Sequence, residues 1–179
     1  GTNASGFFIR CGGFPVPNYH TIVDGIYAVA TLSTGEAYPV ESVLWYVADM
    51  DLAVLQIARR STQGISTSAF ASLELVGTSD IRAGDTVYTL GNPLGLGLAV
   101  SSGIISATAR TVERYSQPCI MNTADISQGS SGGALLNEKG QVIAVTSGAY
   151  AYGNNMYLAV PVDPVMTLDL SGPGVTLAE

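Results

Sequence analysis

The chain has 179 residues and a formal net charge of −7 at pH 7, from 7 Lys and Arg against 14 Asp and Glu. Nucleic-acid binding depends on cations that neutralise phosphates, so this balance argues against a nucleic-acid partner. Apolar residues make up 47% of the chain, and no apolar run approaches the ~18 residues that a membrane span needs. We therefore expect no membrane span in this chain and a substantial apolar core.

Short strand-like segments recur along the chain, with turn residues between them. We expect strands at 7–9, 26–32, 40–47, 52–57, 86–90, 98–107, 119–122, 134–137, 141–146 and 157–162. Residues 137–140 are typical of a hairpin turn, and Asp163-Pro164 could start a short helix. Many short strands without a long amphipathic helix predict an all-β sandwich or barrel.

The only histidine, His20, and a serine flanked by glycines, Ser131, are typical of a nucleophilic serine hydrolase. A serine hydroxyl is a weak nucleophile, so it needs an adjacent base, a carboxylate that orients the base, and backbone donors for the oxyanion. Glycines at 129, 132 and 133 let the backbone turn tightly around the serine. Taken alone, this glycine-rich run is equally consistent with a flexible turn.

Asp51 is the favoured carboxylate. It directly precedes an apolar stretch, so we expect it at the mouth of a buried strand, where it can accept a hydrogen bond from the imidazole. Asp49 is the alternative, and either residue could instead be a solvated turn carboxylate. The order His20, Asp51, Ser131 is the one that chymotrypsin-type enzymes use, and it excludes an α/β hydrolase, which needs the serine first.

Several segments, in the same order along the chain, resemble the trypsin-like serine proteases of the HtrA/Deg type. They are residues 5–9, 18–20, 51–55, 84–88, 91–95, 102–106, 129–133 and 158–161. The resemblance implies a chymotrypsin fold of two six-stranded antiparallel β-barrels, with the active site in the cleft between them. It implies an N-terminal barrel in residues 1–78 and a C-terminal barrel with a short tail in residues 79–179.

The resemblance also implies how substrate is bound. The backbone amides of Gly129 and Ser131 would form the oxyanion hole. An extended peptide would pair with Val145, Thr146 and Ser147, with Gly148 at the pocket rim. Counted from the serine without gaps, Thr146 matches the hydroxyl residue that hydrogen-bonds the triad aspartate in trypsin-like enzymes.

Two residues of the expected specificity pocket point to different substrates. Asp125, six residues before Ser131, matches the position that gives trypsin its preference for Lys and Arg. Ile126 matches the apolar wall of HtrA relatives that cut after small or medium aliphatic residues. We expect an aliphatic P1 residue, with Asp125 held outside the pocket.

The sequence supports no cofactor or metal. The segment Gly91-Asn92-Pro93-Leu94-Gly95 lacks the lysine and the following helix of a phosphate loop. Cys11 and Cys119 form no C-x-x-C pair, so neither a metal site nor a redox site is expected. The two cysteines are either bridged or buried free thiols.

We therefore expect a serine endopeptidase that acts on unfolded or extended polypeptide through an acyl-enzyme intermediate. The alternative is a catalytically silent barrel used for binding or adhesion, although such proteins usually lack a triad residue. The resemblance implies an extracytoplasmic location, a monomer or trimer, and a PDZ or other domain, if there is one, outside this chain.

Overall fold

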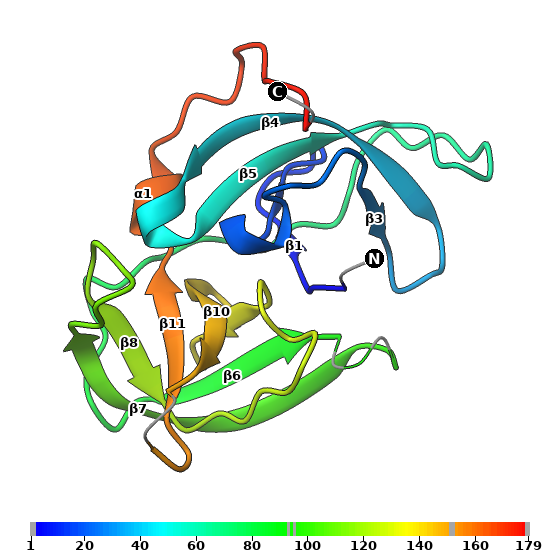
Figure 1. Ribbon diagram of the computed structural model, residues 1–179. Coiled ribbons are helices and arrows are strands. Elements are labelled where there is room, and N and C mark those ends of the chain that lie inside the picture. Colours follow the sequence, from blue (N-terminus) through cyan, green and yellow to red (C-terminus); the bar gives the residue numbers. More distant parts are fainter. Residues whose placement is uncertain (1–2, 93, 95, 151–152, 178–179) are drawn as a thin grey trace.

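The computed structural model describes residues 3–92, 94, 96–150 and 153–177, where nearly all regular structure is β-strand (Figure 1). In chain order the elements are β1 (Phe7–Phe8), β2 (Pro15–Val16), η1 (Tyr19–Thr21), β3 (Val29–Thr31), β4 (Ala37–Val47), η2 (Ala48–Met50), β5 (Leu52–Ile57), β6 (Thr86–Gly91), β7 (Ala99–Arg110), β8 (Cys119–Asn122), β9 (Ala134–Leu136), β10 (Val142–Ala149), β11 (Tyr157–Pro161) and α1 (Asp163–Met166). The all-β prediction is confirmed. No helix among the described residues has the length and apolarity needed to cross a membrane. Pro93 and Gly95 of the expected 91–95 motif lie outside the described residues.

The second half of the chain forms a closed six-stranded antiparallel barrel, in the order β10, β11, β8, β7, β6, β9. Closure pairs both edges of the sheet, which an open sheet would leave exposed. Several strands contribute apolar side chains to its core, including Val87, Ile105 and Leu135, each at most 1% exposed. This barrel confirms the architecture that the resemblance implies for the second half.

The first half is built differently. Its described strands form a three-stranded antiparallel sheet, β3-β4-β5, and a separate pair, β1-β2, an arrangement consistent with the two-barrel fold that the resemblance implies. The strands β1 and β2 have two residues each, and Pro15 and Pro17 lack the N–H that a longer ladder requires. Aromatic packing stabilises this half. The ring of Phe70 stacks on that of Phe8 with centroids 4.9 Å apart, and it packs edge-on against that of Tyr38 with centroids 5.0 Å apart.

One apolar cluster joins the two halves, which face each other in Figure 1. It contains Val16 and Leu52 from the first half and Val145 and Leu158 from the second, all at most 1% exposed. Burial of a side chain of this size stabilises the fold by about 1.5–3 kcal/mol. The cluster thereby holds the start of β5 against β10, and the candidate site lies there. The boundary near residue 78 falls between β5 and β6 and stays a prediction.

Candidate active site

Asp51 lies in the turn between η2 and β5. Its backbone is left-handed, with φ 54° and ψ 39°, a conformation that aspartate and asparagine tolerate better than most residues. This turn ends the 3₁₀ helix and places the side chain beside the core, so that the residue is only 7% exposed. The carboxylate is largely shielded from water and depends on donors from the protein.

His20, on η1, is held against this carboxylate. Its backbone N–H donates to Asp51 Oδ1 at 2.8 Å, and its ring Nδ1 lies 2.8 Å from Oδ2 and 3.0 Å from Oδ1. Because a carboxylate can only accept, Nδ1 is the donor, and Nε2 is the ring nitrogen left to take a proton. The N–H of Tyr19 and the side-chain amide of Asn18 both donate to the Asp51 carbonyl oxygen at 3.1 Å, which fixes η1 beside the turn.

Asp49 does not take this place. It lies on η2 with an exposed side chain, and its carbonyl oxygen accepts the N–H of Ser116 at 2.8 Å. Of the two carboxylates that the sequence offered, the structure brings Asp51 to the imidazole.

Ser147 links the nucleophile candidate to the carboxylate. The Ser131 hydroxyl donates to the carbonyl oxygen of Ser147 at 3.1 Å, and the Ser147 hydroxyl donates to Asp51 Oδ2 at 3.3 Å. One residue of β10 therefore contacts both Ser131 and Asp51, and Asp51 contacts His20. The three residues expected from the sequence meet at one place, between the two halves of the chain.

The turn around Ser131 depends on two glycines with positive φ. Gly129 has φ +90° and Gly132 has φ +88°, and a Cβ at Gly132 would lie 2.2 Å from the carbonyl oxygen of Ser5. No side chain fits there. Within the described part of the chain, the N–H groups of Gly129 and Ser131 donate to no other group, so both are available to an oxygen atom bound beside the serine.

The side chain that donates a hydrogen bond to the Asp51 carboxylate is Ser147. The prediction that Thr146 makes this hydrogen bond is therefore wrong. Thr146 Oγ1 donates to the carbonyl oxygens of Ser130 at 2.9 Å and Gly133 at 3.1 Å. The register of β10 with β9 shifts between Val142 and Ala144. The register of β10 with β11 also shifts, between Thr146 and Gly148, and irregularities of this kind change which face of a strand a side chain occupies.

Only part of the expected peptide-binding segment lies at a free edge. Val145 pairs with β9 and with β11, and the N–H and C=O of Thr146 are bonded to Gly133 and Gly132, at 2.9 and 2.8 Å. Both residues are buried members of the barrel. Ser147 and Gly148 follow the last residue pair between β9 and β10. Of the four residues expected to bind a peptide, only these two remain candidates for pairing with a substrate strand.

Ser5 was not anticipated as a site residue. Its N–H donates to the Ser131 carbonyl oxygen at 2.8 Å, and its hydroxyl donates to the Gly129 carbonyl oxygen at 2.7 Å. The same hydroxyl accepts the N–H of Asn92 at 2.8 Å. Ser5 therefore ties the N-terminal segment to both sides of the turn around Ser131. The sequence offered a motif at residues 5–9 but no sign of what its serine contacts.

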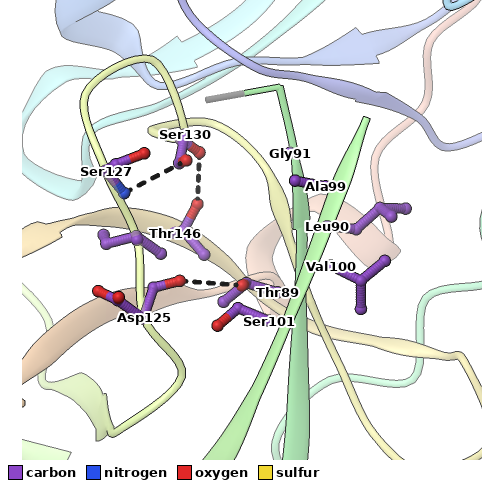
Figure 2. Close-up of a pocket in the computed structure, with 11 residues that line it drawn as sticks. Thr89, Leu90, Gly91, Ala99, Val100, Ser101, Asp125, Ser127, Ser130 and Thr146 are labelled. Carbon is purple, nitrogen blue, oxygen red and sulfur yellow. Dashed lines mark hydrogen bonds between the residues drawn. The ribbon is translucent and has the colours of Figure 1, made fainter. Parts of the chain in front are cut away.

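A cavity of about 160 Å³ lies beside this turn (Figure 2). It is lined by β6, β7, the segment that leads to Ser131, and β10, through Thr89, Leu90, Gly91, Ala99, Val100, Ser101, Asp125, Ile126, Ser127, Ser130 and Thr146. Ile126 and Asp125, both predicted as pocket residues, are among them. Its volume is below the roughly 300–1,000 Å³ of small-molecule sites and suits one side chain.

The Asp125 carboxylate has a partner outside this cavity. Asp125 Oδ1 accepts the hydroxyl of Tyr157 at 2.5 Å, and this hydrogen bond raises the pKa of Tyr157 above its usual value. Figure 2 shows the carboxylate pointing away from Thr89 and Ser101, while the Asp125 carbonyl oxygen accepts from Thr89 Oγ1 at 3.4 Å. The carboxylate is thus turned out of the pocket.

Cys11 and Cys119 are both free thiols, so they do not form a disulfide. The expectation that free thiols would be buried holds for Cys119, whereas Cys11 is exposed. Burial raises the pKa of the Cys119 thiol to about 11, with Arg114 opposing and Asp51 adding to this effect. A thiol with a raised pKa is a poor nucleophile at neutral pH.

Residues 4–145 match the family model described as a trypsin-like peptidase domain. This chain belongs to that family. A relative of this peptidase domain from Chlamydia pneumoniae, named "Probable periplasmic serine endoprotease DegP-like", is 33% identical over 159 residues, which cover 87% of this chain and 30% of that protein. A second, "Serine protease HTRA2, mitochondrial" from Drosophila pseudoobscura pseudoobscura, is 30% identical over 171 residues, which cover 92% of this chain and 38% of that protein.

The fold of the peptidase domain is also found in solved structures. "HtrA-type protease AlgW with decapeptide" matches with a TM-score of 0.80 at 26% identity, and the match covers 91% of this chain and 49% of that chain. The resemblance to HtrA-type proteases is confirmed. The chain spans about a third of the length of these two relatives and about half of the solved structure.

Proposed function

We propose that this chain is a serine endopeptidase domain in which Ser131 is the nucleophile, His20 the general base and Asp51 the residue that orients His20. The observation that carries the proposal is that Ser147 bonds to both Ser131 and Asp51 while Asp51 bonds to His20. In a triad, the carboxylate fixes the imidazole tautomer and stabilises the imidazolium that forms during reaction. The two bonds that the Asp51 carboxylate receives from His20 suit that role.

The first chemical step requires the Ser131 hydroxyl to turn from the Ser147 carbonyl oxygen to His20 Nε2. Catalytic hydrogen bonds often form only once substrate is bound. Oγ then bonds to the peptide carbonyl carbon as its proton passes to Nε2, and the C=O electron pair moves onto oxygen. The N–H groups of Gly129 and Ser131 bind this oxyanion, and each such donor stabilises the transition state by about 3–4 kcal/mol.

The intermediate collapses by breaking the C–N bond, while His20 gives its proton to the leaving amine. Water then attacks the acyl-enzyme, again with its proton passing to His20, and Ser131 is restored. No group beyond these residues and water is needed to balance the two steps.

The substrate that suits this site is an extended or unfolded polypeptide. Ser147 and Gly148 lie past the last residue pair between β9 and β10, so a peptide can add to β10 there as a further strand. Main-chain hydrogen bonds of this kind require a substrate segment that has no partner of its own, which an unfolded chain provides.

For the P1 residue we propose an aliphatic side chain. The cavity has room for one side chain, and the apolar residue Ile126 is among those that line it. A Lys or Arg at P1 would need a buried anion, but the Asp125 carboxylate is already bonded to Tyr157. Profiling of cuts in an unstructured protein by mass spectrometry tests this. Cuts mostly after Lys or Arg, lost in Asp125→Ala, would contradict it.

An extracytoplasmic location is the setting that we propose for this activity. The relatives carry periplasmic and mitochondrial names, and both compartments are separate from the cytosol. Fractionation of the source cells tests this, and recovery of the protein in the cytosolic fraction would contradict it.

The decisive experiment for the activity is labelling with a fluorophosphonate, which reacts with activated serines. We expect wild type to be labelled and to cut unstructured protein, and we expect Ser131→Ala to do neither. Ser130→Ala, beside the nucleophile, should still be labelled. A catalytically silent barrel would leave wild type as unreactive as Ser131→Ala.

A further inference from the structure

A tyrosine lies directly behind Ser147. The hydroxyl of Tyr115, in the loop between β7 and β8, is hydrogen-bonded to Ser147 Oγ, and the Ser147 hydroxyl reaches Asp51 Oδ2 at 3.3 Å. Tyr115 is 9% exposed and Ser147 is 6% exposed. With His20, these groups form a continuous line of hydrogen bonds from a phenol in the second half of the chain to the imidazole in the first.

Chemistry fixes the direction of donation along this line. A carboxylate only accepts, so Ser147 must donate to Asp51. A serine hydroxyl has a single proton, so the bond between Tyr115 and Ser147 must use the proton of the phenol. Hydrogen bonds joined head to tail in a poorly solvated site polarise one another, so Tyr115 strengthens the bond that Ser147 makes to Asp51.

The groups around Tyr115 keep it a neutral donor. Burial raises the pKa of Tyr115, and Asp51 and Cys119 add to this, while its bond to Ser147 and the charge of Arg114 oppose it. The guanidinium carbon of Arg114 lies 4.7 Å from the centre of the Tyr115 ring. Two further carboxylates lie on or beside this loop, Glu113 and Asp49, and both side chains are exposed. Tyr115 therefore carries its proton throughout the neutral pH range.

The loop is held in place without the phenol hydroxyl. The N–H of Tyr115 donates to the Val112 carbonyl oxygen at 2.9 Å, and the N–H of Ser116 donates to the Asp49 carbonyl oxygen at 2.8 Å. The ring itself belongs to the apolar cluster that joins the two halves. Tyr115→Phe therefore keeps the ring and the loop and removes only the donor.

We propose that Tyr115 is a positioning residue that acts on Asp51 through Ser147 and spreads the charge of the carboxylate over the line of donors. This inference rests on the proposed triad. A carboxylate whose charge is shared in this way attracts an imidazolium less strongly, which favours the form of the ring that can accept the Ser131 proton. Tyr115 thereby extends the activity of the domain toward mildly acidic pH.

The test is the rate at which a fluorophosphonate labels Ser131, measured from about pH 5 to about pH 9 across the acidic limb of the profile. In this reaction Oγ displaces fluoride from phosphorus and its proton passes to His20, so no substrate needs to be known. We expect Tyr115→Phe to move the midpoint of the limb upward by about 0.3 pH unit, with about twofold slower labelling below the midpoint and an unchanged plateau.

Ser147→Ala breaks the same line one bond closer to Asp51. Its midpoint should move upward by about 1 pH unit, and adding Tyr115→Phe to it should change nothing further, because the tyrosine then has no hydroxyl to act through. Tyr38→Phe is the matched control. Tyr38 is a buried tyrosine at the start of β4, away from the line of hydrogen bonds, and its hydroxyl bonds to Glu36 at 2.9 Å.

The outcomes separate this inference from the proposed function. If wild type is not labelled at all, the proposed function fails. If wild type is labelled and Tyr115→Phe follows the same profile, or is slower by the same factor at every pH, only the role of Tyr115 fails. Additive shifts in the double variant would also overturn it. Should Tyr115→Phe not fold, an unshifted midpoint in Ser147→Ala would overturn it instead.

Discussion

Removal of the Ser5 hydroxyl should weaken both the fold and catalysis, because this hydroxyl bonds to groups on the turn around Ser131. In Ser5→Ala the Gly129 carbonyl oxygen loses a donor at 2.7 Å and the Asn92 N–H loses an acceptor at 2.8 Å. A lost hydrogen bond and an unsatisfied, partly buried group together cost about 2 kcal/mol. For a chain of this length, that lowers the unfolding temperature by about 4–8 °C. Circular dichroism during heating measures this change.

The effect on catalysis comes from the position of Gly129, whose N–H is a proposed oxyanion donor. A displacement of about 1 Å in a catalytic group can cost as much as 100-fold in rate, and we expect a loss of about tenfold in fluorophosphonate labelling of Ser5→Ala. Ser61→Ala is the matched control. Ser61 is similarly buried, at 6% against 7% for Ser5, and its hydroxyl accepts the Ile65 N–H at 3.0 Å in a distant loop. Equal labelling rates in the two variants would refute a role of Ser5 at the active site.

Three further predictions follow from the same geometry. Asp51→Asn should fold normally and lose roughly 10⁴-fold in turnover on an unstructured protein substrate, whereas Asp49→Asn should lose little; the reverse would transfer the orienting role to Asp49. Gly132→Ala places a Cβ 2.2 Å from the Ser5 carbonyl oxygen and should cost more than about 3 kcal/mol in urea unfolding, whereas Gly140→Ala, also at positive φ but with no atom within 4 Å, should cost about 1 kcal/mol. Burial raises the pKa of the Cys119 thiol from 9.0 to about 11, so between these pH values the folded state keeps a proton that the unfolded state loses. The free energy of unfolding should therefore fall by about 2–3 kcal/mol as pH rises through this range, and by less in Cys119→Ala.

The strands were predictable because their pattern is local. The segment Leu52–Ile57 is apolar except for Gln56 and has no glycine or proline, and it forms β5 as expected. The two-residue strand β2, Pro15–Val16, was missed because a strand this short leaves no alternation to detect. Closure of the six-stranded barrel in the second half depends on pairings between distant segments that no local pattern encodes.

The candidate site could be predicted as far as residue chemistry reaches. A single histidine, an aspartate before an apolar run and a serine between glycines were enough to place His20, Asp51 and Ser131. Ser5, Tyr115 and the bond from Ser147 to Asp51 were beyond that reasoning, since they depend on contacts between residues far apart in the chain. The exchange of Thr146 for Ser147 shows the limit plainly, because β10 shifts register against both neighbouring strands and no local sequence pattern marks these shifts.

The left-handed backbone of Asp51 also limits how this domain can change during evolution. At φ 54° the position favours glycine, asparagine and aspartate over all other residues, and only aspartate among these carries a charge. A duplicated copy released from selection would therefore lose its carboxylate most readily to asparagine or glycine, and it would keep the fold when it did. Glutamate, the other acidic residue, would be strained in this backbone conformation, so aspartate is the only acidic residue that suits this turn.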